Sequence, residues 1–138
     1  MKLPVEIQDL AQAALQARLN SYSPYSKYKV GAAIRTKAGH LFSGCNVENS
    51  TYGATVCAER VAVQKAVSEL GKVEVVDVVV VTDSSPPGTP CGICRQVISE
   101  FGAQATIHTI NPQGEYMSFK MSELLPSPFL PSHLEKHT

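Results

Sequence analysis

Three cysteines and one glutamate are spaced as a metal site with a proton carrier beside it. Cys57 stands two residues before Glu59. Cys91 directly follows Pro90, and two residues separate it from Cys94. Three protein ligands leave a fourth position open on zinc, as catalytic sites do. Zinc lowers the pKa of a bound water toward neutrality, and a neighbouring carboxylate can then move its protons. The pattern predicts one catalytic zinc per chain, bound by Cys57, Cys91 and Cys94, with Glu59 as proton shuttle.

The charge of three thiolates exceeds that of a divalent cation, so the site needs further positive charge. We expect Cys57 and Cys91 to lie in the first turns of two helices, whose N-termini each carry about half a positive charge. Arg60 follows Glu59 and could donate to the cysteine sulfurs; a solvated helix residue is an equally good explanation of Arg60. His-x-Glu followed by Pro-Cys-x-x-Cys is a signature of zinc deaminases, in which Cys sometimes replaces His.

Two other uses of the cysteines are less favoured. A redox Cys-x-x-Cys pair leaves Cys57 and Glu59 unexplained, and a structural zinc site requires a fourth ligand that the spacing does not supply. Cys45 falls in an expected strand and is interpreted as a small core residue. We assign no role to the histidines, which stand at positions 40, 108, 133 and 137.

The elements that must position these residues alternate between helical and strand patterns. Helices are expected at 4–19, 57–70 and 91–101. Strands are expected at 29–35, 41–47, 75–81, 105–110 and 116–119. The run at 75–81 is almost entirely β-branched, which is typical of a strand buried on both faces. This order predicts a single α/β domain over residues 1–138, in three layers, with a mixed sheet of about five strands flanked by helices.

Composition narrows the class of protein. The 138 residues include 43% hydrophobic and 17% charged residues, as in ordinary globular proteins. Twelve basic and 12 acidic residues give a formal charge of zero, which argues against nucleic-acid and membrane partners. No apolar stretch is long enough to span a bilayer, and the first residues do not resemble a signal peptide. We therefore expect a cytoplasmic protein, in which four cysteines suggest metal binding or catalysis rather than disulfides.

Asn46 and Glu48 are candidates for binding a sugar. Residues two apart on a strand share a face, and an amide beside a carboxylate suits hydrogen bonds to vicinal hydroxyls. Without the nearby zinc pattern, the ordinary polarity of a strand end would be the better explanation.

The sequence resembles the short, homotetrameric cytidine deaminases over nearly its whole length. The similar blocks are SPYSKYKVGAA at 23–33, GCNVEN at 44–49, TVCAER at 55–60, PCGICRQ at 90–96 and ELLP at 123–126. The resemblance implies a central sheet flanked by helices, one Zn²⁺ on the three cysteines, and hydrolysis of cytidine and 2′-deoxycytidine to the uridine product and ammonia. A zinc-bound hydroxide would attack C4 while Glu59 transfers protons.

The resemblance also implies roles for residues around the metal. Asn46 and Glu48 would bind the ribose hydroxyls, and Arg60 would contact the zinc-bound sulfurs. Phe129 would close over the pyrimidine of a neighbouring subunit, so that active sites are shared across a homotetramer. Tyr28 stands where most relatives have phenylalanine; it keeps the ring near the substrate but adds a hydroxyl that needs a partner.

Alternative functions remain open from the sequence. A related deaminase could act on another small cytosine-containing substrate, although a diol-binding pair would then have no purpose. Nucleic-acid deaminases share the metal pattern, but the balanced charge suggests no strand-binding surface. A protein-interaction module stabilised by zinc would share the cysteine ligands but catalyse no reaction.

Overall fold

The β-branched run Val75–Val81 forms β3, the middle strand of a five-stranded sheet with the order β2-β1-β3-β4-β5. In this computed structural model, which describes residues 3–134, β1 (Gly31–Thr36) pairs antiparallel with β3, and β4 (Thr106–Ile110) pairs parallel with it. The edge strands are β2 (Leu41–Cys45) and β5 (Tyr116–Lys120), each antiparallel to its neighbour. The expectation of a mixed sheet is confirmed.

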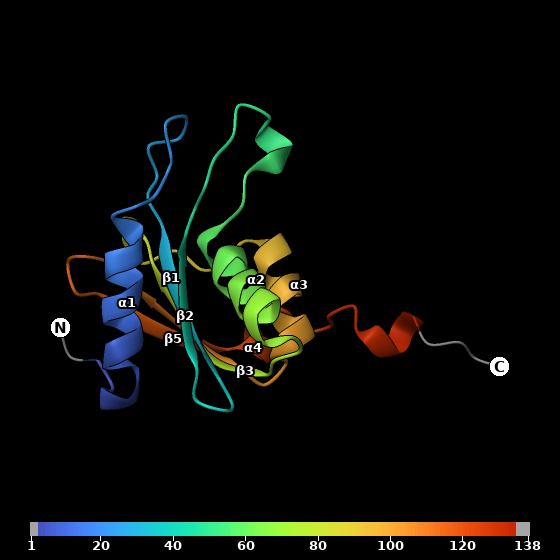
Figure 1. Ribbon diagram of the computed structural model, residues 1–138. Helices are drawn as coiled ribbons and strands as arrows, with labels where there is room; N and C mark the ends of the chain where they lie inside the picture. The colour runs from blue at the N-terminus through green and yellow to red at the C-terminus, as the bar shows by residue number, and fades with distance from the viewer. Residues whose placement is uncertain (1–2, 135–138) are drawn as a thin grey trace.

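Helices cover both faces of this sheet (Figure 1). Val79 and Val81 pack against α1 (Gln8–Arg18) on one face. Val78 and Val80 face the other way, into the core shared with α2 (Ala58–Leu70) and α3 (Gly92–Phe101). Each valine is at most 1% exposed, and burying such a side chain contributes about 1.5–3 kcal/mol. The alternation along one strand therefore holds the three layers together.

The sheet order brings the beginnings of α2 and α3 to the same edge. Strands β3 and β4 are parallel and α3 connects them, so α3 runs antiparallel to both. Helix α2 ends at Gly71, whose φ of 79° suits glycine, and the chain then turns back into β3. Both helices thus begin near the carboxyl end of β3, and they pack against each other. Residues 57 and 91 are placed side by side by this topology.

Several boundaries differ from the expected ones. Residues Val5–Ile7 form a 3₁₀ turn before α1, and the strands at 29–35 and 41–47 are shorter than expected because the segments beside the site leave the sheet. Three short elements were not expected: 3₁₀ turns at Tyr52–Ala54 and Pro131–Leu134, and α4 at Met121–Leu124. Cys45 ends β2 and is half-buried. His137 lies outside the described residues. Within residues 3–134, no helix is long and apolar enough to cross a membrane.

Gly44 allows β2 to lie directly on the first turns of α2. A Cβ atom at this position would be 2.8 Å from both the Ala58 carbonyl oxygen and the Ala62 nitrogen. No side chain fits there without moving the backbone of the helix. The beginning of α2 is therefore held at a fixed distance from the sheet.

Candidate active site

The sulfur atoms of Cys57, Cys91 and Cys94 form one cluster, with all three Sγ atoms within 4.8 Å of one another. The Sγ atoms of Cys57 and Cys91 are 3.9 Å apart, close to the separation of about 3.8 Å that tetrahedral zinc with 2.3 Å bonds requires. Within residues 3–134, no histidine, cysteine or acidic residue joins the group as a fourth ligand. The donor set fits zinc and leaves a coordination position open.

The start of each helix sets the direction of these sulfurs. Cys57 and Cys91 are the N-cap residues of α2 and α3, with extended backbone angles, and neither side chain makes a capping hydrogen bond. Cys94 is the third residue of α3, and side chains at the N-cap and third positions face each other, as in a capping box. The sequence placed Cys57 and Cys91 inside the first turn; they stand one residue earlier, still beside the positive helix ends.

The thiols of Cys57 and Cys94 differ in how readily they ionise. A hydrogen bond from the Cys94 thiol, assisted by Arg60, lowers the pKa of Cys57 to about 5. The same hydrogen bond, together with burial, raises the pKa of Cys94. Nη2 of Arg60 lies 3.9 Å from the sulfur of Cys57 and also donates to the Thr55 carbonyl at 3.0 Å. Of these two thiols Cys57 therefore ionises more readily, whereas Cys94 must release a proton when a metal binds.

Glu59 lies beside this cluster in a setting that favours proton transfer. It is the second residue of α2 and is only 4% exposed. Burial, with a smaller contribution from the negative charge of Cys57, raises the pKa of Glu59 to about 7. A carboxyl group with this pKa can both accept and return a proton near neutral pH.

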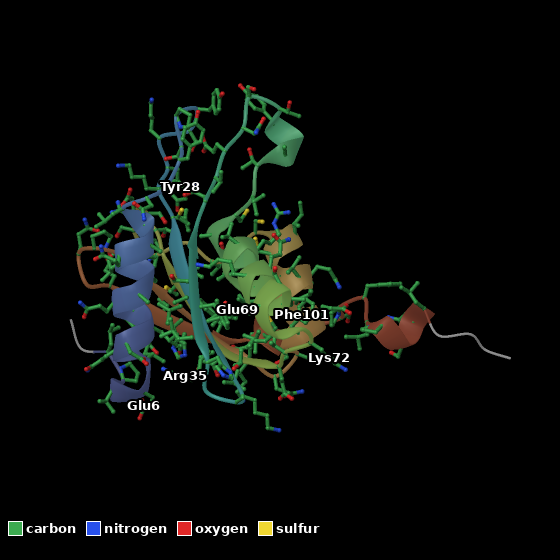
Figure 2. The ribbon with its side chains drawn as sticks, in the orientation of Figure 1. Glu6, Tyr28, Arg35, Glu69, Lys72 and Phe101 are labelled. Carbon is green, nitrogen blue, oxygen red and sulfur yellow. The ribbon has the colours of Figure 1, made fainter. Side chains whose placement is uncertain are left out.

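A cavity of about 250 Å³ connects the cluster with the residues expected to bind substrate. Cys57, Glu59 and Cys91 line one part of it, and Tyr28, Asn46 and Glu48 line another. Figure 2 shows Tyr28 on the segment before β1, at the same end of the molecule as the starts of α2 and α3. The volume is near the lower limit of about 300 Å³ for ligand pockets, so it suits a small molecule.

The hydroxyl group of Tyr28 has a partner within the protein. It lies 3.1 Å from Oγ of Ser84, which is in turn 3.0 Å from Oγ1 of Thr82. Thr82 also lines the cavity, and its Oγ1 accepts a hydrogen bond from the backbone nitrogen of Gly88 at 2.8 Å. The aromatic wall of the cavity is therefore connected to the end of β3 and to the loop that leads to Cys91.

Asn46 is buried and holds the polypeptide segment that forms the cavity wall. Its Oδ1 atom accepts hydrogen bonds from the hydroxyl of Ser21 and, at 3.0 Å, from the backbone nitrogen of Val30. Its Nδ2 atom donates to the carbonyl of Tyr28 at 2.7 Å. One amide hydrogen remains for a ligand.

Glu48 plays a comparable part in the same segment. Its Oε1 atom accepts from the backbone nitrogens of Tyr25 and Ser26 at 3.0 and 3.2 Å, and its Oε2 atom accepts from the Ser26 hydroxyl. The Ser26 hydroxyl is the main reason that the pKa of Glu48 is lowered. The ionised carboxylate keeps about one of its four lone-pair positions for a ligand. The sequence gives no sign of this structural use, because two of the three donors are backbone groups and all of them lie 22–23 residues earlier in the chain.

Comparisons with known proteins agree with this geometry. The family described as "Cytidine and deoxycytidylate deaminase zinc-binding region" matches residues 4–110. The chain belongs to this family. It is 46% identical over 123 residues to cytidine deaminase of Halalkalibacterium halodurans, covering 88% of this chain and 92% of the relative. It is 34% identical over 109 residues to blasticidin-S deaminase of Bacillus cereus, covering 73% and 76%. The crystal structure of cytidine deaminase from Burkholderia pseudomallei superposes with a TM-score of 0.84 at 38% identity, covering 92% of this chain and all of that one.

Membership in this deaminase family, together with the cysteine cluster, fits one zinc per chain and makes the protein a zinc-dependent hydrolase. Phe129 does not line the cavity of its own chain. Its side chain is 54% exposed, and its ring centroid is 5.3 Å from that of His133. The C-terminal segment that carries Phe129 extends away from the sheet on the side of α3 (Figure 1).

We predict that Cys91→Ser loses most of its zinc, because a hydroxyl group replaces a thiolate ligand. Cys45 lies outside the sulfur cluster, so Cys45→Ser is the matched control and should keep one zinc per chain. Elemental analysis of the two purified variants checks this. Loss of zinc from Cys45→Ser with retention in Cys91→Ser would contradict the assignment.

Proposed function

We propose that this chain hydrolyses cytidine and 2′-deoxycytidine to uridine and 2′-deoxyuridine, releasing ammonia. The observation that carries the proposal is the position of Glu59, buried beside three clustered thiols and facing the same cavity. Cytoplasmic location is part of the proposal. The cysteines are free thiols, and a reducing compartment keeps thiol ligands from oxidation.

Zinc, when bound to the three sulfurs, would act as a Lewis acid and bring the pKa of a water molecule toward neutrality. Glu59 is placed to accept one proton from the attacking water and deliver it to N3 of the pyrimidine, which makes C4 more electrophilic. After the oxygen has added to C4, Glu59 takes the second proton from this oxygen and gives it to the exocyclic amino group. The bond from C4 to that nitrogen then breaks, and ammonia leaves. A pKa of about 7 suits each transfer.

The other end of the cavity provides groups for the nucleoside. The ring of Tyr28 offers a flat face for the pyrimidine. The free amide hydrogen of Asn46 can donate to a sugar hydroxyl, and the remaining lone pair of Glu48 can accept from one. We assign these three residues to substrate binding and Arg60 to the sulfur of Cys57, which it contacts.

A second candidate is a deaminase for another small cytosine-containing substrate. Asn46 and Glu48 make most of their possible hydrogen bonds to the chain's own loop. They therefore have fewer groups left to bind a sugar diol than the sequence suggested. The similarity to a blasticidin-S deaminase also keeps this candidate open. Turnover of cytidine compared with blasticidin S separates the two.

We predict that Glu59→Gln retains zinc but loses cytidine turnover by about 10⁴-fold, the upper end for one acid–base group, because one carboxyl serves several transfers. The fall in ultraviolet absorbance as uridine forms measures the rate. Glu69 is exposed near the other end of α2, so Glu69→Gln is the control and should match the wild type. Activity of Glu59→Gln within about tenfold of wild type would remove Glu59 from the mechanism.

We predict that kcat/KM is at least about tenfold higher for cytidine than for free cytosine. Without the sugar, Asn46 and Glu48 lose a partner in a desolvated site, and an unpaired buried polar group costs about 1–3 kcal/mol. Steady-state kinetics on both compounds test this. Equal values would show that the two residues serve the loop alone.

We further propose a homotetramer in which Phe129 completes the cavity of a neighbouring subunit. Two observations support this: Phe129 is exposed and outside its own cavity, and Gln96 fixes its backbone, donating from Nε2 to the Phe129 carbonyl at 2.6 Å. Cys91 lines the cavity and is exposed, and Ile93, two residues later, is 62% exposed. An aromatic ring placed there would stack on the base and exclude water.

We predict that Phe129→Ala raises KM for cytidine without loss of zinc. Co-expression of differently tagged Phe129→Ala and Glu59→Gln chains should restore turnover at low cytidine. In the hybrid, sites with an intact Glu59 receive Phe129 from the other chain. Hybrids no faster than Phe129→Ala alone, or a fully active monomer in sedimentation, would exclude shared sites.

A further inference from the structure

Arg95, the residue after the metal ligand Cys94, joins two segments that are far apart along the chain. Its Nε atom donates to the Pro90 carbonyl at 2.7 Å, and its Nη2 atom donates to Oγ1 of Thr89 at 2.8 Å. Its Nη1 atom donates to the carbonyl of Leu124, at the end of α4, at 2.8 Å. All three guanidinium nitrogens therefore donate hydrogen bonds, which the planar, forked arrangement of the guanidinium donors allows. One side chain therefore holds both the turn before Cys91 and the C-terminal segment.

Gln96 strengthens the same connection. Besides donating to the Phe129 carbonyl, its Oε1 atom accepts from the Phe129 backbone nitrogen at 3.4 Å. Leu124 and Leu125 pack against the core beneath α3, so the segment is attached by apolar contacts as well. Two adjacent residues of the metal-binding helix thus reach the C-terminal segment at both ends of 124–129.

We propose that Arg95 is a positioning residue that couples the metal-binding turn to the C-terminal segment, so that zinc binding and ordering of residues 121–130 promote each other. Arg95 acts through the peptide at residues 89–90, which immediately precedes Cys91. A metal on Cys91 and Cys94 limits the motion of this turn and keeps its acceptors in place for the guanidinium. By linkage, an ordered C-terminal segment then tightens zinc binding to the same extent. The coupling requires the zinc site but not the identity of the substrate.

Hydrogen exchange on the wild-type protein tests the coupling first. Stripping zinc with a chelator should speed amide exchange in residues 121–130 by about tenfold, within the range that outer partners of metal ligands usually contribute. The β1–β2 turn at residues 37–40 lies at the opposite end of the sheet from the starts of α2 and α3 (Figure 1), and its exchange should not change. Equal exchange at 121–130 with and without zinc would overturn the proposal.

Zinc release from variants tests the role of Arg95 itself. Arg95→Gln should release zinc to a chromophoric chelator about tenfold faster than wild type, and exchange at 121–130 should no longer depend on zinc. Arg35 is a matched control, since it donates to the Glu6 carbonyl at 3.1 Å and to Asp9 at 2.6 Å, on the α1 side of the sheet. Arg35→Gln should release zinc at the wild-type rate even if it lowers the urea midpoint of unfolding.

Two milder variants keep the test decisive if Arg95→Gln does not fold. Thr89→Val removes one acceptor and should release zinc at a rate between those of wild type and Arg95→Gln. Gln96→Ala frees only the Phe129 end of the segment, so it should accelerate zinc release less than Arg95→Gln does. Wild-type release from Thr89→Val and Arg95→Gln, or equal acceleration in Arg35→Gln, would show that Arg95 has only a general structural role. Because no substrate is present in these measurements, failure to turn over cytidine would not affect the outcome.

Discussion

The parallel alignment of α2 and α3 is the constraint on which the site depends. Three sulfurs and the Glu59 carboxyl group meet at one point, and bringing so many acidic groups together is unfavourable unless positive charge is present. Two helix N-termini provide part of it, and Arg60 provides more. The arrangement follows from topology: α3 is the crossover between the parallel strands β3 and β4, and α2 leads into β3 from the same face. Gly44 then fixes the distance of α2 from the sheet, because any side chain there would meet its backbone.

Features that depend on local patterns could be predicted from the sequence. The order of the main helices and strands and the buried central strand follow from periodicity and turn residues, and the types and spacing of the cysteines indicated the metal site that their cluster fits. The ends of elements could not be predicted as well, since a helical period does not distinguish an N-cap from a first turn; Cys57 and Cys91 were misplaced for this reason. The four residues of α4 are too few to show a helical period. Their one local signal is Glu123, whose Oε1 atom accepts from the Lys120 backbone nitrogen at 2.8 Å.

The functions of Asn46 and Glu48 show a different limit of sequence reasoning. Their partners lie 16–25 residues earlier in the chain, and several of these partners are backbone groups, which any residue type would supply. No spacing rule can therefore reveal them. Structurally, these bonds order the segment that carries Tyr28, and they hold both side chains in place before a ligand arrives. Such preorganisation reduces the entropy that is lost on binding, so support of the loop and recognition of a sugar are compatible uses of one pair.

Polar side chains that hydrogen-bond to backbone groups of irregular segments recur around the cavity. Irregular segments leave backbone groups without partners, and such groups must be satisfied when they are shielded from water. Here Asn46 and Glu48 satisfy the segment before β1, whereas Arg95 and Gln96 satisfy the turn before Cys91 and the C-terminal segment. Each of these side chains makes two or more bonds, so one substitution removes several at once. Loss of activity after replacing Glu48 or Arg95 does not therefore distinguish contact with substrate from support of the cavity wall. That distinction requires separating KM from kcat and comparing both with zinc content.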